Sequence, residues 1–84
     1  ALDRKIASFL AHLAVRRSPH TVRAYAADLS GMAEALENDP AHLTPDRLRL
    51  WLRRAAPTPV TRARKLSAAR SFVRHLVATG ELES

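Results

Sequence analysis

The sequence predicts an all-α domain of four helices, and three observations lead to it. Only two of the 84 residues are glycine, and no useful run alternates apolar with polar residues as a half-buried strand does. Proline follows a hydroxyl residue at Ser18-Pro19, Thr44-Pro45 and Thr58-Pro59. A hydroxyl at the N-cap accepts a free backbone N–H, and proline at the first helical position loses no hydrogen bond. Apolar residues then recur at helical spacing after each pair.

The first two helices account for the N-terminal half of the chain. The first is predicted from about Asp3 to Arg16, with one apolar face formed by Ile6, Phe9, Leu10 and Leu13. The second is predicted over about residues 19–37. Its inward residues are Val22, Tyr25, Ala26, Leu29, Met32, Ala33 and Leu36. The segment Asn38-Asp39-Pro40 breaks this pattern and is expected to form a loop.

The last two helices are separated by prolines. A short third helix is predicted over 45–55, burying Leu48, Trp51 and Leu52, and Pro57 and Pro59 prevent it from continuing. The fourth is predicted over 59–79, with Gly80 just past its end. Its apolar stripe is Leu66, Ala69, Val73, Leu76 and Val77, with Phe72 on the flank. Short connections make neighbouring helices pack together, so residues 1–84 are expected to form one compact bundle.

Composition excludes several functional classes. The chain has no cysteine, so it has neither a disulfide framework nor a thiolate metal site, which fits an intracellular setting. No apolar run approaches the roughly 20 residues needed to span a bilayer, and no signal peptide is recognisable. We therefore expect a soluble cytoplasmic protein that uses no membrane.

Positive charge is concentrated in parts of the chain. The net charge is +6, and 12 of the 14 basic residues are arginine. That bias suits phosphate contact, because the guanidinium fork binds an oxyanion with two hydrogen bonds, although GC-rich codon usage would also produce it. Residues 47–77 carry nine basic residues and no acid, and a second basic cluster contains Arg16, Arg17 and Arg23. Segregated charge is expected of a protein that presents one face to a polyanion, whereas solvated helix surface is the alternative.

The fourth helix is the most informative element. At about 100° per residue, Arg64, Ala68, Ser71 and His75 fall opposite the apolar stripe, with Thr61 and Lys65 on its flank. Arg62 lies on the apolar side in the first turn, where a long side chain can reach past the core. Arginine for guanine edges or phosphates, threonine for phosphate and a small residue for close approach suit a helix in the DNA major groove.

The start of the second helix offers a similar surface. His20, Thr21, Arg23 and the free N–H groups of the first turn could together hold a phosphate. The alternative is that this Ser-Pro pair only caps the helix.

Two segments resemble a known family. Residues 18–29 resemble the S-x-x-T-x-x-x-Y-x-x-D-L signature near the N-terminus of tyrosine recombinases of the Xer and phage-integrase type. Residues 61–72 resemble their R-x-L-S-A-x-R-S-F helix, with Lys65 where many relatives have arginine. Thr44-Pro45 and Gly80-Glu81-Leu82 also match in order and spacing. The likeness covers nearly the whole chain.

The resemblance implies a four-helix, SAM-like core-binding domain, which forms one half of a clamp around DNA. In that family the second and fourth helices face the major groove. The implied DNA contacts are His20, Thr21, Arg23 and Ala24 on the second helix, and Thr61, Arg62, Arg64, Lys65 and Ala68 on the fourth. Ala24 and Ala68 rest mainly on the family.

The resemblance places the family's chemistry in a second, C-terminal domain that this chain lacks. That chemistry is DNA cleavage and rejoining through a 3′-phosphotyrosine, so this fragment is not expected to be an enzyme. Its implied partners are double-stranded DNA and further recombinase subunits in a synaptic tetramer. Integration, recombination and chromosome partition are all compatible roles, in a bacterial or phage-encoded protein associated with the nucleoid. Tyr25 lies on the apolar stripe, which favours a core tyrosine over a nucleophile.

Other sites and functions have less support. The four histidines lie on different elements without metal-binding spacing, and no glycine-rich phosphate loop is present, so we expect no metal and no cofactor. The main alternative function is a SAM-like protein–protein interaction domain whose basic face meets an acidic partner. A helix-turn-helix regulator is disfavoured, because the long helices lack the short glycine turn that this motif often uses.

Overall fold

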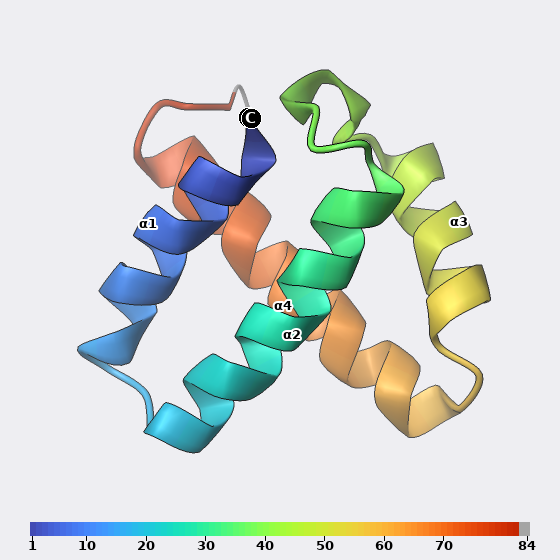
Figure 1. Ribbon diagram of the computed structural model, residues 1–84, viewed down its shortest axis with the longest axis horizontal. Helices are drawn as coiled ribbons and strands as arrows, with labels where there is room; N and C mark the ends of the chain where they lie inside the picture. Colours follow the sequence, from blue (N-terminus) through green and yellow to red (C-terminus); the bar gives the residue numbers. More distant parts are fainter. Residues whose placement is uncertain (83–84) are drawn as a thin grey trace.

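A computed structural model describes residues 1–82 and shows four α-helices and no strand in this range. The helices are α1 (Leu2–Ala14), α2 (Pro19–Ala35), α3 (Pro45–Ala55) and α4 (Pro59–Ala78), with the 3₁₀ turn η1 (Pro40–His42) after α2 (Figure 1). The predicted all-α bundle is confirmed. The predicted ends of the first, second and fourth helices were one or two residues too late.

Three of the four helices begin as the hydroxyl–proline pairs predict. The side-chain oxygens of Ser18, Thr44 and Thr58 accept the backbone N–H groups three residues later. Helix α1 begins differently, because its start is capped from another part of the chain. The backbone carbonyl of Asn38 accepts the Leu2 N–H at 3.1 Å, and its side-chain Oδ1 accepts the Asp3 N–H at 2.7 Å. The loop after α2 therefore fixes where α1 starts.

Helices α2 and α4 end with the same hydrogen-bond pattern. At the end of α4, Gly80 has a φ of +77° and Glu81 donates its N–H to Leu76 O at 2.8 Å. This is the Schellman arrangement, and it confirms Gly80 as the residue just past the helix. At the end of α2, Asn38 donates to Ala33 O at 2.8 Å while Glu37 takes the left-handed conformation with a φ of 57°. This turn stops α2 at Ala35, two residues before the predicted end.

Helices α2 and α4 cross in the centre of the molecule, and α1 and α3 flank the crossing on opposite sides (Figure 1). The core fills the space between them, with the Phe9 and Phe72 ring centroids 5.7 Å apart. Its largest fully buried apolar side chains are Leu2, Leu29, Met32, Leu36, Phe72 and Leu76. Within residues 1–82, no helix is long and apolar enough to cross a membrane.

The buried face of α4 differs from the predicted stripe. Ala68 and Phe72 are fully buried, whereas Leu66, Val73 and Val77 are only half-buried. The prediction that placed Ala68 on the outer face is wrong. Ala68 follows Arg64 by one turn, so the two share a face, and Arg64 bonds to α2. The helix is covered by α2 and α1 as well as by α3, so a single apolar stripe does not describe its burial.

Candidate nucleic-acid interface

The N-terminal turns of α2 and α4 lie at one edge of the molecule, on either side of the helix crossing (Figure 1). The two helices begin with the same local motif, a hydroxyl residue and proline followed by threonine at the third helical position. Ser18 Oγ lies 3.1 Å from Thr21 Oγ1, and Thr58 donates its hydroxyl to Thr61 Oγ1 at 3.0 Å. Each start also carries the positive end of the helix dipole, although Pro19 and Pro59 have no N–H and the caps occupy the N–H groups of Thr21 and Thr61.

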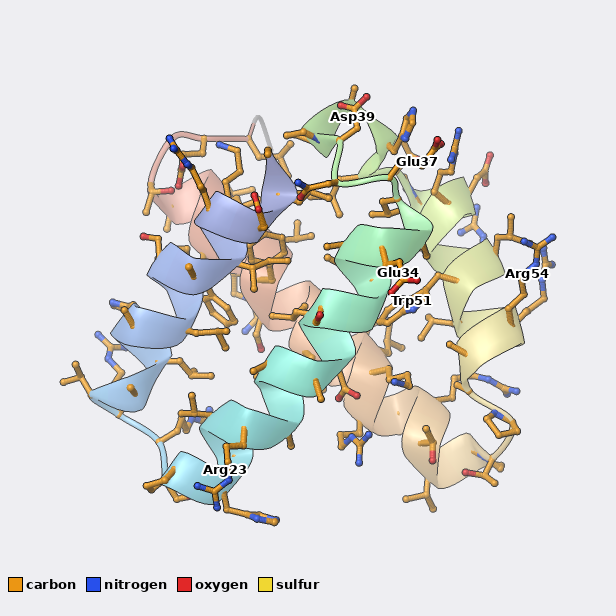
Figure 2. The ribbon with its side chains drawn as sticks, viewed as in Figure 1. Arg23, Glu34, Glu37, Asp39, Trp51 and Arg54 are labelled. Atoms are coloured by element: carbon orange, nitrogen blue, oxygen red, sulfur yellow. The ribbon has the colours of Figure 1, made fainter. Side chains whose placement is uncertain are left out.

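The predicted contact residues on α2 occupy its first two turns. His20 and Arg23 are exposed, and Thr21 and Ala24 are half-buried. Figure 2 shows Arg23 at the outer edge of the α2 start, away from the core. These four residues therefore lie on the accessible part of the α2 start.

The predicted residues at the α4 start are less uniform. Thr61 is half-buried, and its N–H completes the Thr58 cap at 3.2 Å. Arg62 is exposed but donates through Nη2 to the Ala56 carbonyl at 3.4 Å, so it also braces the connection between α3 and α4. Ala68 is 0% exposed and lies outside the accessible surface.

A buried carboxylate joins the two helices at their crossing. Asp28 of α2 is 1% exposed and is the one buried polar side chain among residues 1–82. Its Oδ2 accepts Arg64 Nε at 3.0 Å, and its Oδ1 accepts Arg64 Nη2 and Lys65 Nζ, each at 3.0 Å. Burial of an unpaired carboxylate is very unfavourable, so these two cations make the position of Asp28 possible.

The same contacts hold the Arg64 side chain in its charged form and in one orientation. Hydrogen bonding to Asp28, and next the negative charge of that carboxylate, raise the pKa of the Arg64 guanidinium above its ordinary value. Two cations around one carboxylate leave the cluster with net positive charge. The crossing is therefore a basic site rather than a neutral ion pair.

The two cations of this cluster differ in exposure. The Arg64 side chain is 52% exposed, whereas that of Lys65 is 15% exposed. Lys65 Nζ also lies 5.7 Å from the centroid of the Trp51 ring, which projects from α3 toward α2 (Figure 2). Lys65 thus links α2, α3 and α4, and Arg64 faces the outside.

Sequence reasoning assigned no role to Asp28, although it is the aspartate of the S-x-x-T-x-x-x-Y-x-x-D-L signature. The available signal was helical spacing, because Asp28 follows Tyr25 by three residues and so shares its inward face. Tyr25 is half-buried against the core, and its hydroxyl lies 3.1 Å from Ser67 Oγ of α4. This places its hydroxyl at the edge of the helix contact.

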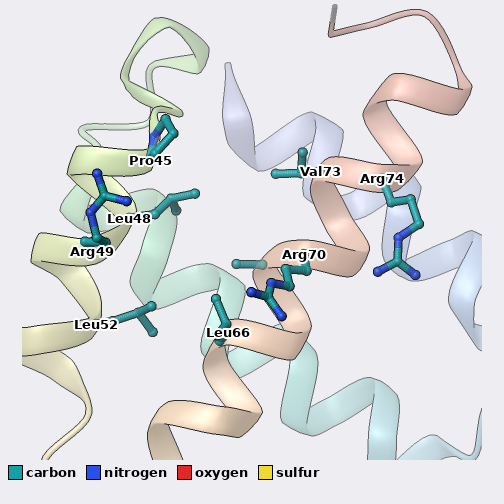
Figure 3. Close-up of a pocket in the computed structure, with 9 residues that line it drawn as sticks. Pro45, Leu48, Arg49, Leu52, Leu66, Arg70, Val73 and Arg74 are labelled. Atoms are coloured by element: carbon teal, nitrogen blue, oxygen red, sulfur yellow. The ribbon is translucent and has the colours of Figure 1, made fainter. Parts of the chain in front are cut away.

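A second basic feature lies between α3 and α4. A groove of about 640 Å³ has an apolar floor that includes Leu48, Leu66 and Val73. Figure 3 shows Arg49 on the α3 side and Arg70 and Arg74 on the α4 side of this groove. Arg49 pairs with Asp46, whereas neither Arg70 nor Arg74 has a carboxylate within 4.0 Å in the described part of the chain. These three arginines, Arg49, Arg70 and Arg74, form the groove rim.

A family model described as "Phage integrase, N-terminal SAM-like domain" matches residues 6–80. The chain belongs to this family. The match confirms the resemblance carried by residues 18–29 and 61–72, and the parent proteins of this SAM-like domain are tyrosine recombinases. Comparisons with curated proteins and with solved structures give no match.

Proposed function

We propose that this SAM-like domain is the DNA-binding module of a site-specific tyrosine recombinase. It binds one recombination half-site by placing the N-terminal halves of α2 and α4 in the major groove. The observation that carries this proposal is the arrangement at the crossing. Two helix starts of the same construction lie at one edge (Figure 1), and the half-exposed Arg64 of α4 is bonded to Asp28 of α2 at the crossing.

The distribution of charge supports the same edge as the DNA-binding surface. Arg23 lies there, and Arg16 and Arg17 directly precede the α2 start. The acids Glu37 and Asp39 lie at the opposite edge of the molecule (Figure 2). A duplex that approaches the helix starts therefore meets positive charge and lies far from Glu37 and Asp39.

In this proposal the domain holds DNA while the full-length enzyme performs strand exchange in a synaptic tetramer. Cleavage through a 3′-phosphotyrosine then depends on residues outside this chain. The half-buried Tyr25 stabilises the contact between α2 and α4 through Ser67 and takes no part in chemistry.

Duplex binding by this 84-residue chain tests the proposal. We expect the logarithm of affinity to fall linearly with the logarithm of salt concentration, because each neutralised phosphate releases counterions. Arg23→Gln should reduce the steepness of that line by about one unit. The matched control is Arg4→Gln, since Arg4 is exposed near the start of α1, at the opposite edge. Absence of binding to any duplex at low salt, or binding that salt leaves unchanged, contradicts the proposal.

The α3–α4 groove favours one alternative function, the binding of an amphipathic helix from another protein. An apolar floor with a cationic rim complements a helix whose apolar face is bordered by glutamates. In that case a designed peptide of leucine and glutamate binds the chain, and Val73→Glu abolishes that binding while duplex binding is absent.

A further inference from the structure

The Arg64 guanidinium is bound to Asp28 through only one of its edges. Its Nε and Nη2 atoms each lie 3.0 Å from a different oxygen of the carboxylate, which is the side-on bidentate geometry. A guanidinium carries five N–H donors in one plane. Two point at Asp28, so three remain, and two of these are parallel N–H groups on Nη1 and Nη2 at the end of the side chain.

The free end of Arg64 is directed outward. Asp28 is 1% exposed, whereas the Arg64 side chain is 52% exposed, so the edge that binds the carboxylate lies inside and the remaining donors meet solvent. Lys65 does not present donors to solvent in the same way. Its ammonium group contacts Asp28 and the Trp51 ring, and its side chain is only 15% exposed. Only one of the two adjacent cations is therefore available to a ligand.

We infer that Arg64 reads a guanine base, and that Asp28 is the positioning residue that presents its end edge to that base. The inference rests on the proposed DNA binding. The O6 and N7 atoms of guanine are two adjacent acceptors in the major groove, and a bidentate arginine is their commonest specific partner. Two parallel donors held in one plane fit that pair.

A base edge suits Arg64 better than a phosphate does. The Asp28 carboxylate offsets part of the attraction that the guanidinium exerts on a phosphate, whereas recognition of an uncharged guanine depends on directed donors. Arg64 of α4 is held at the crossing by Asp28 of α2, and the two helix starts can take phosphates through their dipoles and threonine hydroxyls. In this arrangement the helix starts orient the duplex by binding phosphates, and Arg64 reads the base.

Selection of duplexes from a randomised library by the 84-residue chain provides the test. We expect one position at which guanine is strongly preferred. Arg64→Lys keeps the positive charge and a partner for Asp28 but loses the two-donor edge. It should weaken binding to the selected duplex by about 5- to 150-fold and remove the preference at that position only. The matched control, Arg70→Lys on the same helix, should leave the selected sequence unchanged.

Modified bases identify the edge that is read. Replacing the guanine with 7-deazaguanine removes N7 and should weaken binding, whereas inosine keeps O6 and N7 and should bind within about twofold of guanine. Asp28→Asn should lower the discrimination between guanine and other bases while binding to unrelated duplexes persists or strengthens. A purely structural role for Asp28 predicts instead that both kinds of binding fall together.

The outcomes separate this inference from the proposed function. If the wild-type chain binds duplex with the expected salt dependence but selects no guanine, or if Arg64→Lys retains the full guanine preference, the inference is wrong and DNA binding stands. If inosine weakens binding as much as 7-deazaguanine, readout is not through O6 and N7, and the inference is again wrong. If no duplex binds at low salt, the proposed function fails, and the inference fails with it.

Discussion

The helix crossing and the α3–α4 groove both present arginines from α4, yet their arginines are held very differently. At the crossing, Arg64 is fixed by two hydrogen bonds to a carboxylate that is almost completely buried. On the groove rim, Arg70 and Arg74 border an apolar floor and have no carboxylate partner among residues 1–82 (Figure 3). Within a few turns, one helix therefore carries an arginine held by a buried carboxylate and two arginines that lack such a partner.

This difference separates two contributions that a basic surface can make to DNA binding. An unpaired arginine samples many rotamers and adds attraction that depends little on sequence. An arginine fixed by a buried partner loses less entropy when it binds and presents donors in one plane, so it can discriminate between bases. A count of positive charges does not distinguish an unpaired arginine from a fixed one. The presence of a buried carboxylate partner does.

The largest effect on stability is expected from removing both cations at the crossing. Arg64→Ala combined with Lys65→Ala leaves Asp28 buried without a partner, and we expect the free energy of unfolding to fall by about 3–5 kcal/mol. Urea unfolding followed by circular dichroism measures this loss. It would be a large share of the stability of a domain this size.

The control for this variant is to neutralise the carboxylate as well. Adding Asp28→Asn should recover part of the stability, because an uncharged amide is less unfavourable to bury than a carboxylate. A loss below about 1 kcal/mol in the double variant would show that Asp28 reaches solvent without its partners. Because this variant is expected to unfold readily, Arg64→Lys is the better probe of DNA recognition.

Local signals in the sequence predicted where most helices begin. A capping hydroxyl and a following proline act within one turn, so Ser18, Thr44 and Thr58 could be identified without knowledge of the rest of the chain. The start of α1 could not be explained in this way, because Asn38, its cap, lies 35 residues from Asp3. Gly80 was predictable, and the left-handed Glu37 was not, since a non-glycine residue seldom takes that conformation.

The candidate site was predicted only in part, for a related reason. The two segments that form it were identified from their residues. The buried face predicted for α4 was incorrect, because α4 contacts three other helices and is therefore covered on more than one side. Ala68 was therefore assigned to the outer surface, although it is buried. Asp28 is on α2 and its partners are on α4, so the pairing depends on a crossing that no local pattern specifies.

A smaller effect at the same crossing comes from its hydroxyl pair. Tyr25→Phe removes the contact between Tyr25 Oη and Ser67 Oγ, 3.1 Å apart, and should lower the free energy of unfolding by about 0.5–1.5 kcal/mol. Ser67→Ala should lower it similarly, and the double variant should lose less than the sum of the two. Urea unfolding of all four proteins gives the coupling energy. Additive losses would show that the hydroxyls contribute nothing together.

The smallest effect on stability is expected at the groove rim. Arg70→Gln combined with Arg74→Gln removes two exposed charges that have no carboxylate partner within residues 1–82, so the free energy of unfolding should change by less than about 0.5 kcal/mol. Binding to all duplexes should weaken to a similar extent, with the selected sequence unchanged, because these charges add attraction without readout. Urea unfolding and a repeated duplex selection measure the two quantities. A change in the selected base would place the groove rim in contact with base edges and remove the distinction between the two regions.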